Sequence, residues 1–453
     1  MHKNTNALVK AIRLATLAVV AAPASVLAGG FALNEQSASA MGTANAGAAA
    51  NPENASIVFF NPAGMSQLSG TNISFGATYL NIDAKAKEGA AATRISGNPV
   101  NPAGRGGDIA SGAWLPNFYL AHEVNDFIDV GFGVHAPYGL AADYEDDFVG
   151  RFFADKTELT AIAFTPSVAL NNGQGLSMGL GLNVIYAEGR LTRNQDLGPQ
   201  GEMLGSEPYA DIEGDDVAVT FRVGFLYELS EKTQFGLTAQ TGTELNLKGD
   251  MEVSGLPPQL GMGDTLAEKV EVPLAIPESV SVGVRHNVTD DVTLLAGATY
   301  SRWSRFEELD IISRDPNGDI AGVPGAVISH TTEKWDNTWQ LNVGGIWQAT
   351  PAWAFKAGYA YDESPVGEYV TARIPSTDRH WLTLGAQWKD AQSGWTVDAA
   401  IGTLIFDGNA KVDEVFYQHE NPTEQDPVFG DSRYQAEYEL SAWSAAIEFS
   451  KAF

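Results

Sequence analysis

The sequence contains no cysteine, and its basic residues are scarce. A chain without cysteine forms no disulfides, no cysteine-ligated metal site and no thiol nucleophile. The 27 Lys and Arg residues stand against 56 Asp and Glu, which gives a formal net charge of −29. This balance argues against nucleic acid as a partner, because basic side chains bind phosphates. We expect solvated acidic loops; the alternative is that these loops gather divalent cations at a lipopolysaccharide-like surface.

Long hydrophobic runs are also missing after residue 28, which excludes a protein that spans the membrane with helices. The short apolar run over residues 14–20 follows three basic residues and precedes a small-residue cleavage site, Val26-Leu27-Ala28. This order predicts a signal peptide over residues 1–28, since the run is too short to anchor the chain across about 30 Å of hydrocarbon. The mature chain should begin near Gly29.

Apolar and polar residues alternate with period two from Thr71 onward. Over residues 217–227, for example, every second side chain from Val217 to Tyr227 is apolar, and the segments are long enough to cross a bilayer as tilted strands. A soluble β-sandwich would alternate too, but its strand lengths would rarely repeat so evenly. The sequence therefore predicts an all-β fold, a transmembrane antiparallel barrel over residues 71–453. Its fourteen strands lie near residues 71–84, 111–123, 128–142, 156–170, 175–190, 215–229, 233–248, 278–288, 291–305, 337–349, 353–363, 379–389, 394–406 and 437–453.

The connections between these strands alternate between short turns and long loops. This alternation is typical of a closed barrel in the outer membrane, with the turns and both termini in the periplasm. The terminal Phe453 resembles the assembly signal of outer-membrane barrels and implies the barrel-assembly machinery as a partner, while Lys451 should snorkel to the interface. Aromatic girdles facing outer-membrane lipid and lipopolysaccharide are expected from Trp303, Trp339, Trp347, Trp381, Trp388 and Trp395.

Residues 29–70 do not alternate and are rich in small residues. Asn51-Pro52 and Asn61-Pro62 each place an N-cap residue before a proline at the first helical position, and the apolar residues 57–60 between them need burial. We expect a plug of short helices inside the barrel. The alternative is a flexible extension, because low-complexity tracts are often unstructured.

Several motifs along the chain resemble the FadL family of outer-membrane long-chain fatty acid transporters. Residues 30–35 followed by the triplet Asn61-Pro62-Ala63 look like the hatch of that family, where Asn-Pro-Ala is a signature. The resemblance continues in family order through residues 115–117, 137–140, 301–306, 362–366 and 374–381. It implies a fourteen-stranded barrel closed by a hatch, and the uptake of long-chain fatty acids or similar apolar molecules.

Pro137 lies in the middle of the third predicted strand, where it offers no N–H to a neighbouring strand, and Gly139 permits unusual backbone angles. A harmless bulge is one interpretation. The other is a lateral opening at Pro137, Tyr138 and Gly139, since the resemblance implies a kinked third strand there. Pro166 on the next strand either widens that opening or marks the strand's end.

Two predicted loops, residues 191–214 and 249–277, are candidates for capturing an apolar cargo, because the second is unusually apolar for an exposed segment. The resemblance implies that they form a groove; a small core beneath the loop is the alternative. The predicted ligand-binding residues are Phe31, Leu33, Arg190, Met251, Leu256, Leu260 and Met262.

A fatty acid carboxylate would need a basic partner. Alternation places Arg190, Arg222, Arg285 and Lys356 inward, where pairing with interior acids such as Glu228, Asp398 or Glu448 is the competing role. The resemblance implies basic residues at the outer end of the fifth strand. Arg190 matches one, whereas Glu188 stands where another is expected, so neutral aromatic or aliphatic hydrocarbons stay open as cargo.

We expect no catalytic residue, cofactor or metal site. The seven His residues form no recognisable nucleophile or metal-binding motif, and Gly-x-Ser-x-Gly is missing, which argues against a lipase. A general diffusion porin would share the barrel but not the hatch, and is the other alternative.

Overall fold

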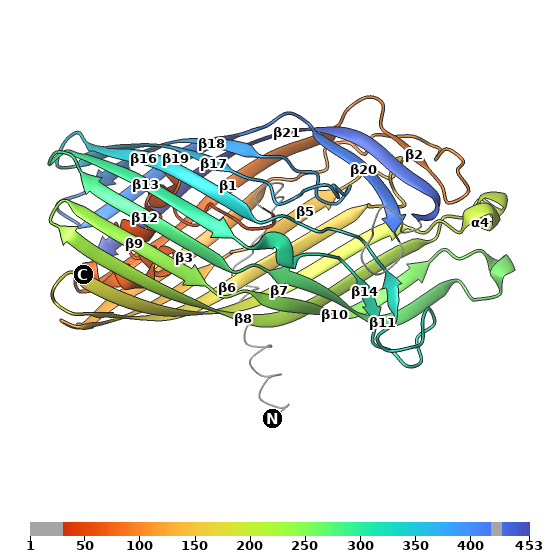
Figure 1. The fold of residues 1–453 in the computed structure, drawn as a ribbon, viewed down its shortest axis with the longest axis horizontal. Coiled ribbons are helices and arrows are strands. Elements are labelled where there is room, and N and C mark those ends of the chain that lie inside the picture. The colour runs from red at the N-terminus through yellow and green to blue at the C-terminus, as the bar shows by residue number, and fades with distance from the viewer. Residues whose placement is uncertain (1–29, 418–427) are drawn as a thin grey trace.

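A computed structural model describes residues 30–417 and 428–453; the predicted signal peptide lies outside this part of the chain. Its strands form one antiparallel sheet that closes on itself where β1 pairs with β21, from Asn72 opposite Ala452 to Ala86 opposite Tyr438. Figure 1 shows the resulting long barrel of tilted strands. Closure pairs the first strand with the last, which is the condition for a sheet exposed to lipid.

The barrel has fourteen strands in the predicted order, several of them divided into two elements. They are β1 (Thr71–Ala86), β3 (Ala113–Asn125), β4 with β5 (Ile128–His135 and Gly139–Asp143), β6 (Lys156–Asn171), β7 (Leu176–Asn194), β8 (Tyr209–Ser230), β9 with β10 (Thr233–Gln240 and Thr243–Ser254), β11 with β12 (Thr265–Ile276 and Ser279–Asn287), β13 (Val292–Ser301), β16 (Thr338–Gln348), β17 (Trp353–Asp362), β18 (Arg379–Lys389), β19 with β20 (Trp395–Phe406 and Ala410–Tyr417) and β21 (Val428–Ala452).

Short turns join the strands at one end of the barrel, here called the turn end, where the C-terminus lies (Figure 1). The opposite loop end carries the longer connections. These contain β2 (Ala91–Thr93), α4 (Gly198–Leu204), η3 (Pro258–Leu260), η4 (Trp303–Arg305), β14 (Ile311–Ser313) and β15 (Val327–Ser329). No helix among residues 30–417 and 428–453 is long and apolar enough to cross a membrane.

The strands reach further toward the loop end than predicted. Most of the predicted loop over residues 249–277 is a hairpin, in which β10 pairs with β11 from Thr243 opposite Ile276 to Ser254 opposite Thr265. The prediction was wrong because alternation continues through this segment: Met251 and Val253 are buried and pack against the inner face of the sheet. Strand β7 likewise extends to Asn194, and β8 begins at Tyr209.

The outer face carries a belt of apolar side chains. In β8, Val219, Phe221 and Val223 are exposed as the alternation predicts, and Trp339, Trp347 and Trp388 of the predicted girdles are exposed as well. Trp303 and Trp381 are buried, so their placement in a girdle was wrong. Trp381 occupies an inward position of β18, and Trp303 lies on η4 beyond the end of β13. At the turn end the ammonium of Lys451 lies 5.5 Å from the centre of the Trp395 ring.

The hatch fills the lumen toward the turn end (Figure 1). Its helices are α2 (Ala38–Met41), η1 (Ala48–Ala50), α3 (Ile57–Phe60) and η2 (Pro62–Gln67). Ile57 and Val58 are buried, as the apolar run requires. The prediction at Asn51-Pro52 was wrong: no helix starts there, and the Asn51 side chain instead donates to Glu53 at 2.8 Å.

Asn61 both begins η2 and docks the hatch on the wall. Its side-chain oxygen accepts the Ala63 N–H at 3.1 Å, and its amide group donates to the carbonyls of Ala49 and Phe225 at 2.6 and 3.0 Å. The close approach requires glycine on the wall, because a Cβ at Gly224 would lie 2.0 Å from the Asn61 side chain. The Asn-Pro-Ala triplet therefore has a docking role in this chain.

A buried charge cluster also anchors the hatch. The ammonium of Lys356, on β17, lies 2.9 Å from Asp398 on β19 and 2.7 Å from Glu53 of the hatch, and it donates to the Ser39 carbonyl at 3.0 Å. Lys356 thus takes the structural role that the sequence left open, pairing with Asp398. A buried carboxylate that loses its partner is strongly unfavourable.

The Lys356→Met variant should therefore be less stable than the natural protein by about 3–5 kcal/mol, because Asp398 would remain buried, and Glu53 half-buried, without a cation. Urea unfolding in lipid vesicles, followed by tryptophan fluorescence, measures this difference. The exposed Lys411 offers a control: Lys411→Met should change the free energy of unfolding by no more than about 0.5 kcal/mol. Equal urea midpoints for Lys356→Met and Lys411→Met would contradict the anchoring role.

Candidate functional site

The wall has a break in its third strand. Residues 136–138 separate β4 from β5, and β3 pairs with β4 only as far as Phe118 opposite Val134. The remaining part of β3, from Ala113 to Asn117, pairs with β1 on its other side, whereas β5 pairs with β6. No ladder of the described residues therefore joins β3 to β5, and Pro137, Tyr138 and Gly139 lie at this wall gap.

The first described residues of the hatch occupy the wall gap. The Leu33 N–H donates to the Pro137 carbonyl at 3.0 Å, and the Gly139 N–H donates to the Phe31 carbonyl at 2.9 Å. Ala32 and Tyr138 thus form an antiparallel bridge at the edge that β3 leaves unpaired. Two backbone hydrogen bonds among the described residues hold this bridge, and the Gln36 side chain adds a third contact by donating to the Ala136 carbonyl at 2.7 Å. A full strand would make more backbone hydrogen bonds than this short segment.

Pro166 also interrupts the wall beside this break. It lies opposite Phe132 of β4, and the paired residues of β6 and β7 skip from Phe164 to Ser167. A proline has no N–H to offer the ladder, which explains the skipped pairs. Pro166 is thus a second interruption of pairing in mid-strand and not the end of a strand.

An aromatic cluster, formed by Phe31, Tyr138, Trp303, Phe306 and Trp335, surrounds the hatch segment at the wall gap. The Phe31 ring lies 4.7 Å from Trp303 and 5.9 Å from Tyr138, measured between ring centres, and Trp335 packs 4.7 Å from Phe306. Phe31 is almost completely buried. The cluster separates two cavities, because Trp303 lines the one toward the hatch and Phe306 the one toward the loop end.

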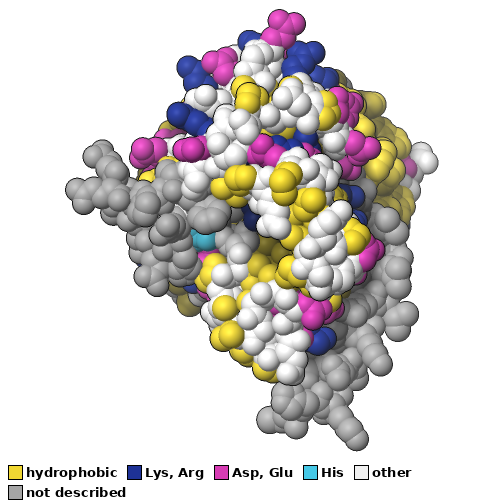
Figure 2. All heavy atoms as spheres, turned by 90° about the vertical axis from the view of Figure 1, so that its right-hand side faces the viewer, with side chains coloured by type: hydrophobic (Ala, Val, Ile, Leu, Met, Phe, Trp, Pro, Cys, Tyr) yellow, Lys and Arg dark blue, Asp and Glu magenta, His cyan; other side chains and the backbone are white. Residues whose placement is uncertain are grey.

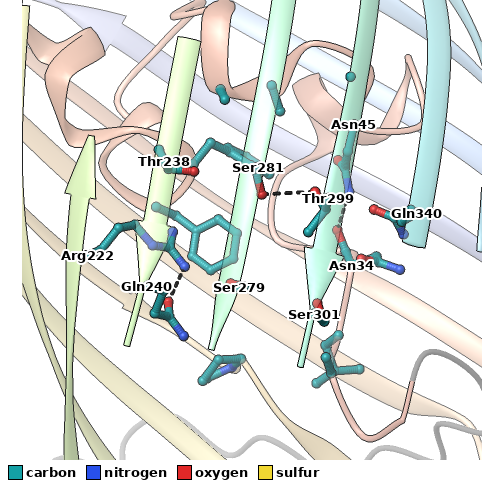
Figure 3. Close-up of a pocket in the computed structure, with 18 of the residues that line it drawn as sticks. Asn34, Asn45, Arg222, Thr238, Gln240, Ser279, Ser281, Thr299, Ser301 and Gln340 are labelled. Atoms are coloured by element: carbon teal, nitrogen blue, oxygen red, sulfur yellow. Dashed lines mark hydrogen bonds between the residues drawn. The ribbon is translucent and has the colours of Figure 1, made fainter. Parts of the chain in front are cut away.

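The inner cavity has a volume of about 190 Å³ and lies between the hatch and the wall. Figure 3 shows the polar side chains that strands β8, β9, β12 and β13 point into it, among them Arg222, Gln240, Ser281 and Thr299. Leu33, Pro137 and Tyr138 belong to the same lining. The inner cavity therefore extends to the inner side of the wall gap. Residues 31–33 of the hatch lie between the cavity and the outside of the barrel wall.

The outer pocket is smaller, about 50 Å³, and almost entirely apolar. Its lining comes from strands β5, β6, β7, β8, β10 and β11, from the connections beyond β13 and β17, and from Phe31 of the hatch. The apolar residues are Phe31, Leu140, Leu159, Leu191, Ile212, Leu247, Val272, Leu274, Phe306, Leu309 and Ile374. Such a lining favours an alkyl chain or an aromatic ring, at about 25 cal/mol for each Å² of apolar surface buried.

Arg373 brings a positive charge to this apolar pocket. Its side chain is 6% exposed, and its guanidinium donates only to neutral oxygens: the Thr157 hydroxyl at 2.8 Å and the carbonyls of Lys156 and Thr192 at 3.2 Å. No carboxylate of the described residues lies within 4.0 Å of it. Glu414, which accepts the Ala372 N–H at 2.7 Å, attracts Arg373 from beyond this distance. A buried cation without a directly bonded anion is unfavourable, which makes Arg373 an anion-binding candidate.

The predicted basic residue of this region, Arg190, lies on the other face of its strand. It shares the outward row of β7 with Leu176, Met178 and Leu180, and it pairs with Asp211 at 2.6 Å. Its assignment to the inward row was wrong, since it is an even number of residues from Leu176, but Arg190 still belongs to the lining of the outer pocket. Glu188 belongs to the same outward row and is exposed, so it does not bear on recognition in the pocket.

Comparisons with known proteins agree with this architecture. Residues 18–453 match the family model described as outer membrane protein transport protein (OMPP1/FadL/TodX). The chain belongs to this family. It is 30% identical over 402 residues to a 47 kDa outer membrane protein of Pasteurella multocida, covering 85% of this chain and 89% of the relative. It is 27% identical over 455 residues to the long-chain fatty acid transport protein of Escherichia coli O6:H1, covering 94% of each.

Two solved structures share the fold of this family member. A Pseudomonas aeruginosa FadL homologue matches with a TM-score of 0.82 at 23% identity, covering 94% of this chain and all of that one. The Pseudomonas putida toluene transporter TodX matches with a TM-score of 0.65 at 15% identity, covering 93% and 99%. The chain is thus an outer-membrane protein of a transport family.

Other motifs of the family resemblance also have a place in this family member. Asp362 and Arg379, the ends of β17 and β18, pair through two hydrogen bonds of 2.6 and 2.9 Å. Asp362 also accepts a hydrogen bond at 3.5 Å from the side chain of Asn34, which follows residues 31–33 of the hatch. Residues 301–306 supply Trp303 and Phe306 to the aromatic cluster. Sequence reasoning missed Trp335 and Arg373, which lie in connections without periodicity; the motif at residues 374–381 stops one residue short of Arg373.

The predicted capture residues divide into two groups. Met251 and Leu256 are buried in the extended hairpin, and neither lines the outer pocket or the inner cavity, so the interpretation as a small core fits them. Met262 at the hairpin tip is 52% exposed, and Met203 on the neighbouring α4 is 78% exposed. Figure 2 looks onto the loop end and shows hydrophobic side chains in the middle of this face, with charged ones around them.

Three potential metal ligands lie together at the loop end, although no metal-binding spacing was found in the sequence. Ligand atoms of Glu308, Asp310 and His330 lie within 4.8 Å of one another. Both ring nitrogens of His330 have protein partners, Asp310 at 2.6 Å and Thr332 at 3.0 Å. A metal would have to displace one of these hydrogen bonds, so the cluster has the contacts of a structural network.

Glu333 links this region to the aromatic cluster, since the Trp335 indole donates to its carboxylate at 2.9 Å. Burial raises the pKa of Glu333 from 4.5 to about 8, and the neighbouring Glu414 adds to the shift. Between pH 4.5 and about 8, Glu333 therefore keeps its proton in the native state, whereas the unfolded chain releases it. Its stability should decrease as the pH rises through this window, and above about pH 8 a charged carboxylate lies beneath Trp335.

Hydrogen exchange of residues 331–337 should accordingly become faster between pH 6 and pH 9 after correction for the intrinsic rate. Glu333→Gln retains an acceptor for Trp335 but does not titrate, so its corrected exchange should stay constant across this range. Parallel curves for the two proteins would show that Glu333 is not the responsible group.

Proposed function

We propose that this chain takes up long-chain fatty acids across the outer membrane. The observation that carries the proposal is Arg373, a buried guanidinium without a carboxylate partner among the described residues, at the wall of an apolar pocket. A fatty acid matches both features, because part of its alkyl chain contacts the apolar lining and its carboxylate accepts from the guanidinium. The fatty acid transport protein among the relatives supports the same cargo.

The proposed route starts at the loop end, facing the outside, and both termini lie in the periplasm, as the short turns at the C-terminal end favour. Met203, Leu260 and Met262 receive the cargo there, at the exposed tips of α4 and the β10–β11 hairpin. The cargo then enters the outer pocket. Acidic loops around this end would contact lipopolysaccharide through divalent cations, and the terminal Phe453 would direct insertion by the barrel-assembly machinery.

Release is proposed to occur laterally, through the wall gap at Pro137, Tyr138 and Gly139. The hatch blocks the lumen toward the turn end, whereas the gap is covered by residues 31–33 through two backbone hydrogen bonds, with the Gln36 side chain bonded beside them. Moving this segment would join the outer pocket to the inner cavity and open the inner cavity to the membrane. Phe31 and Leu33 are thus gate residues that also line the two cavities.

Neutral aromatic or aliphatic hydrocarbons are the second candidate cargo. The apolar lining of the outer pocket suits them, and the toluene transporter among the structural relatives has the same fold. They would leave Arg373 without an anionic partner, which is why we favour an acid. A diffusion porin is a weaker candidate, because the hatch occupies its lumen.

Mass spectrometry of lipid extracted from the purified protein tests the cargo. Long-chain fatty acids should be recovered at about one per barrel, and planar bilayers containing the protein should show no large steady conductance. Recovery of neutral hydrocarbons alone would favour the second candidate. Large currents at rest would favour the porin.

A further inference from the structure

The inner cavity contains a second positive charge that is not neutralised. One guanidinium nitrogen of Arg222, on β8, donates to the Gln240 side chain at 2.5 Å, and the guanidinium stacks over the Phe59 ring of the hatch, 4.6 Å from its centre. No ion pair joins Arg222 to any described residue. Lys356, Arg379 and Arg190 all have carboxylate partners. Arg222 therefore retains donors for an anion.

The cavity lining is mixed: apolar residues such as Leu33, Phe60 and Trp303 alternate with polar groups that can hold the polar end of a cargo. Hydroxyl and amide groups of Thr238, Ser279, Ser281, Thr299, Ser301 and Gln340 point into the same space as Arg222 (Figure 3). A wholly apolar molecule would have to remove water from these groups without replacing their hydrogen bonds, which is unfavourable. A carboxylate would accept hydrogen bonds from the hydroxyls and from the guanidinium.

We propose that the inner cavity is a second binding site for the carboxylate of the cargo, with Arg222 as its anchor. This proposal rests on the proposed uptake of fatty acids and extends it to a two-site relay. Arg373 binds the carboxylate on the loop-end side of the aromatic cluster, and Arg222 binds it on the hatch side. The cargo moves from one arginine to the other when Phe31 leaves the cluster.

The position of Arg222 connects this second site to the wall gap. Gln240, which accepts from Arg222, donates from its own amide to the Tyr138 hydroxyl at 3.3 Å. Tyr138 is the residue that bridges to Ala32 in the gap. A carboxylate at Arg222 competes with Gln240 for the guanidinium, so binding of the cargo weakens a contact that holds the gap residue in place.

Photolabelling of the full-length protein in detergent tests the second site. The probe is a long-chain fatty acid with a diazirine near its carboxyl group, and the matching primary alcohol is the neutral probe. In the natural protein the acid should label peptides of both the outer pocket and the inner cavity, whereas the alcohol should label the outer pocket. Arg222→Met should reduce labelling of the cavity by the acid about tenfold or more without changing labelling of the outer pocket.

Arg222→Lys retains the charge and should retain part of the cavity labelling. Arg285→Met is the matched control, because Arg285 is another inward-facing arginine but does not line the cavity; its labelling should match that of the natural protein. Arg222→Gln provides a second neutral variant if Arg222→Met does not fold.

Cavity labelling that is absent in the natural protein, or unchanged in both neutral variants, would overturn the second site while labelling of the outer pocket supports fatty acid uptake. Failure of the acid to label either cavity would instead contradict fatty acid uptake itself.

Discussion

Replacing Arg373 with leucine should weaken binding of a long-chain fatty acid by about 10- to 100-fold and leave binding of the matching alcohol unchanged. A hydrogen bond to a charged group contributes about 1.5–3 kcal/mol, and each 1.4 kcal/mol changes a dissociation constant tenfold. The carboxylate of the cargo makes this interaction with Arg373, whereas the alkyl chain depends on the apolar lining that leucine retains. Titration of the purified protein with a fluorescent fatty acid and a fluorescent alcohol measures both affinities.

The alcohol also serves as the test for an intact pocket. Arg373 bridges β6 and β7 through Thr157, Lys156 and Thr192, so its removal can loosen the strand ends as well as remove a charge. A loosened pocket would bind both ligands less well. Arg433→Leu is the matched control, because Arg433 is an exposed arginine at the loop end that pairs with Asp413, and it should bind both ligands normally. Equal affinity of Arg373→Leu and the natural protein for the acid would exclude Arg373 as the anchor.

The barrel could be predicted from the sequence because membrane strands leave a local signal. Rows such as Val219, Phe221 and Val223 repeat with the period of a strand, and the turn-end connections are short. Each of the fourteen predicted strands corresponds to one strand of the barrel. The same signal continues beyond residue 248 into the β10–β11 hairpin, where it was overlooked and the segment was predicted to be a loop.

The candidate site was only partly predictable, because its contacts join distant segments. Pro137 and Gly139 mark a break by their own chemistry, whereas nothing near them indicates that residues 31–33 cover it. Trp303 was predicted to be a girdle residue because tryptophan is common there. It is buried instead, because it packs on Phe31, which is distant in the sequence. Arg373 lies in an irregular connection, where no periodicity tells which way a side chain points. The family motif that begins at Ile374 is the sequence signal that could have drawn attention to the neighbouring Arg373.

Locking the hatch segment to the wall gap should abolish transport. Ala32 and Tyr138 face each other in a bridge whose hydrogen bonds are made by the flanking residues. Directly opposed residues of this type have Cα atoms about 4.5 Å apart, which is within the range that a disulfide requires. The natural chain has no cysteine, so an Ala32→Cys/Tyr138→Cys variant can form this disulfide and no other within the chain.

The locked variant should fold and bind fatty acid at the outer pocket, since neither substituted residue lines that pocket. Its reduced form is the essential control, because it has lost the Tyr138 ring and the hydrogen bond from Gln240. Ala32→Cys alone controls for the presence of a thiol in the gap. Both controls should take up fatty acid in the presence and absence of oxidant.

Uptake of a labelled fatty acid by cells that depend on the Ala32→Cys/Tyr138→Cys variant, measured before and after reduction, tests the central claim that cargo leaves past residues 31–33. Oxidised cells should take up no more than cells without the protein, and reductant should restore uptake to the level of the reduced variant. Oxidised cells that take up fatty acid as fast as reduced cells, with the disulfide verified by mass spectrometry, would contradict it.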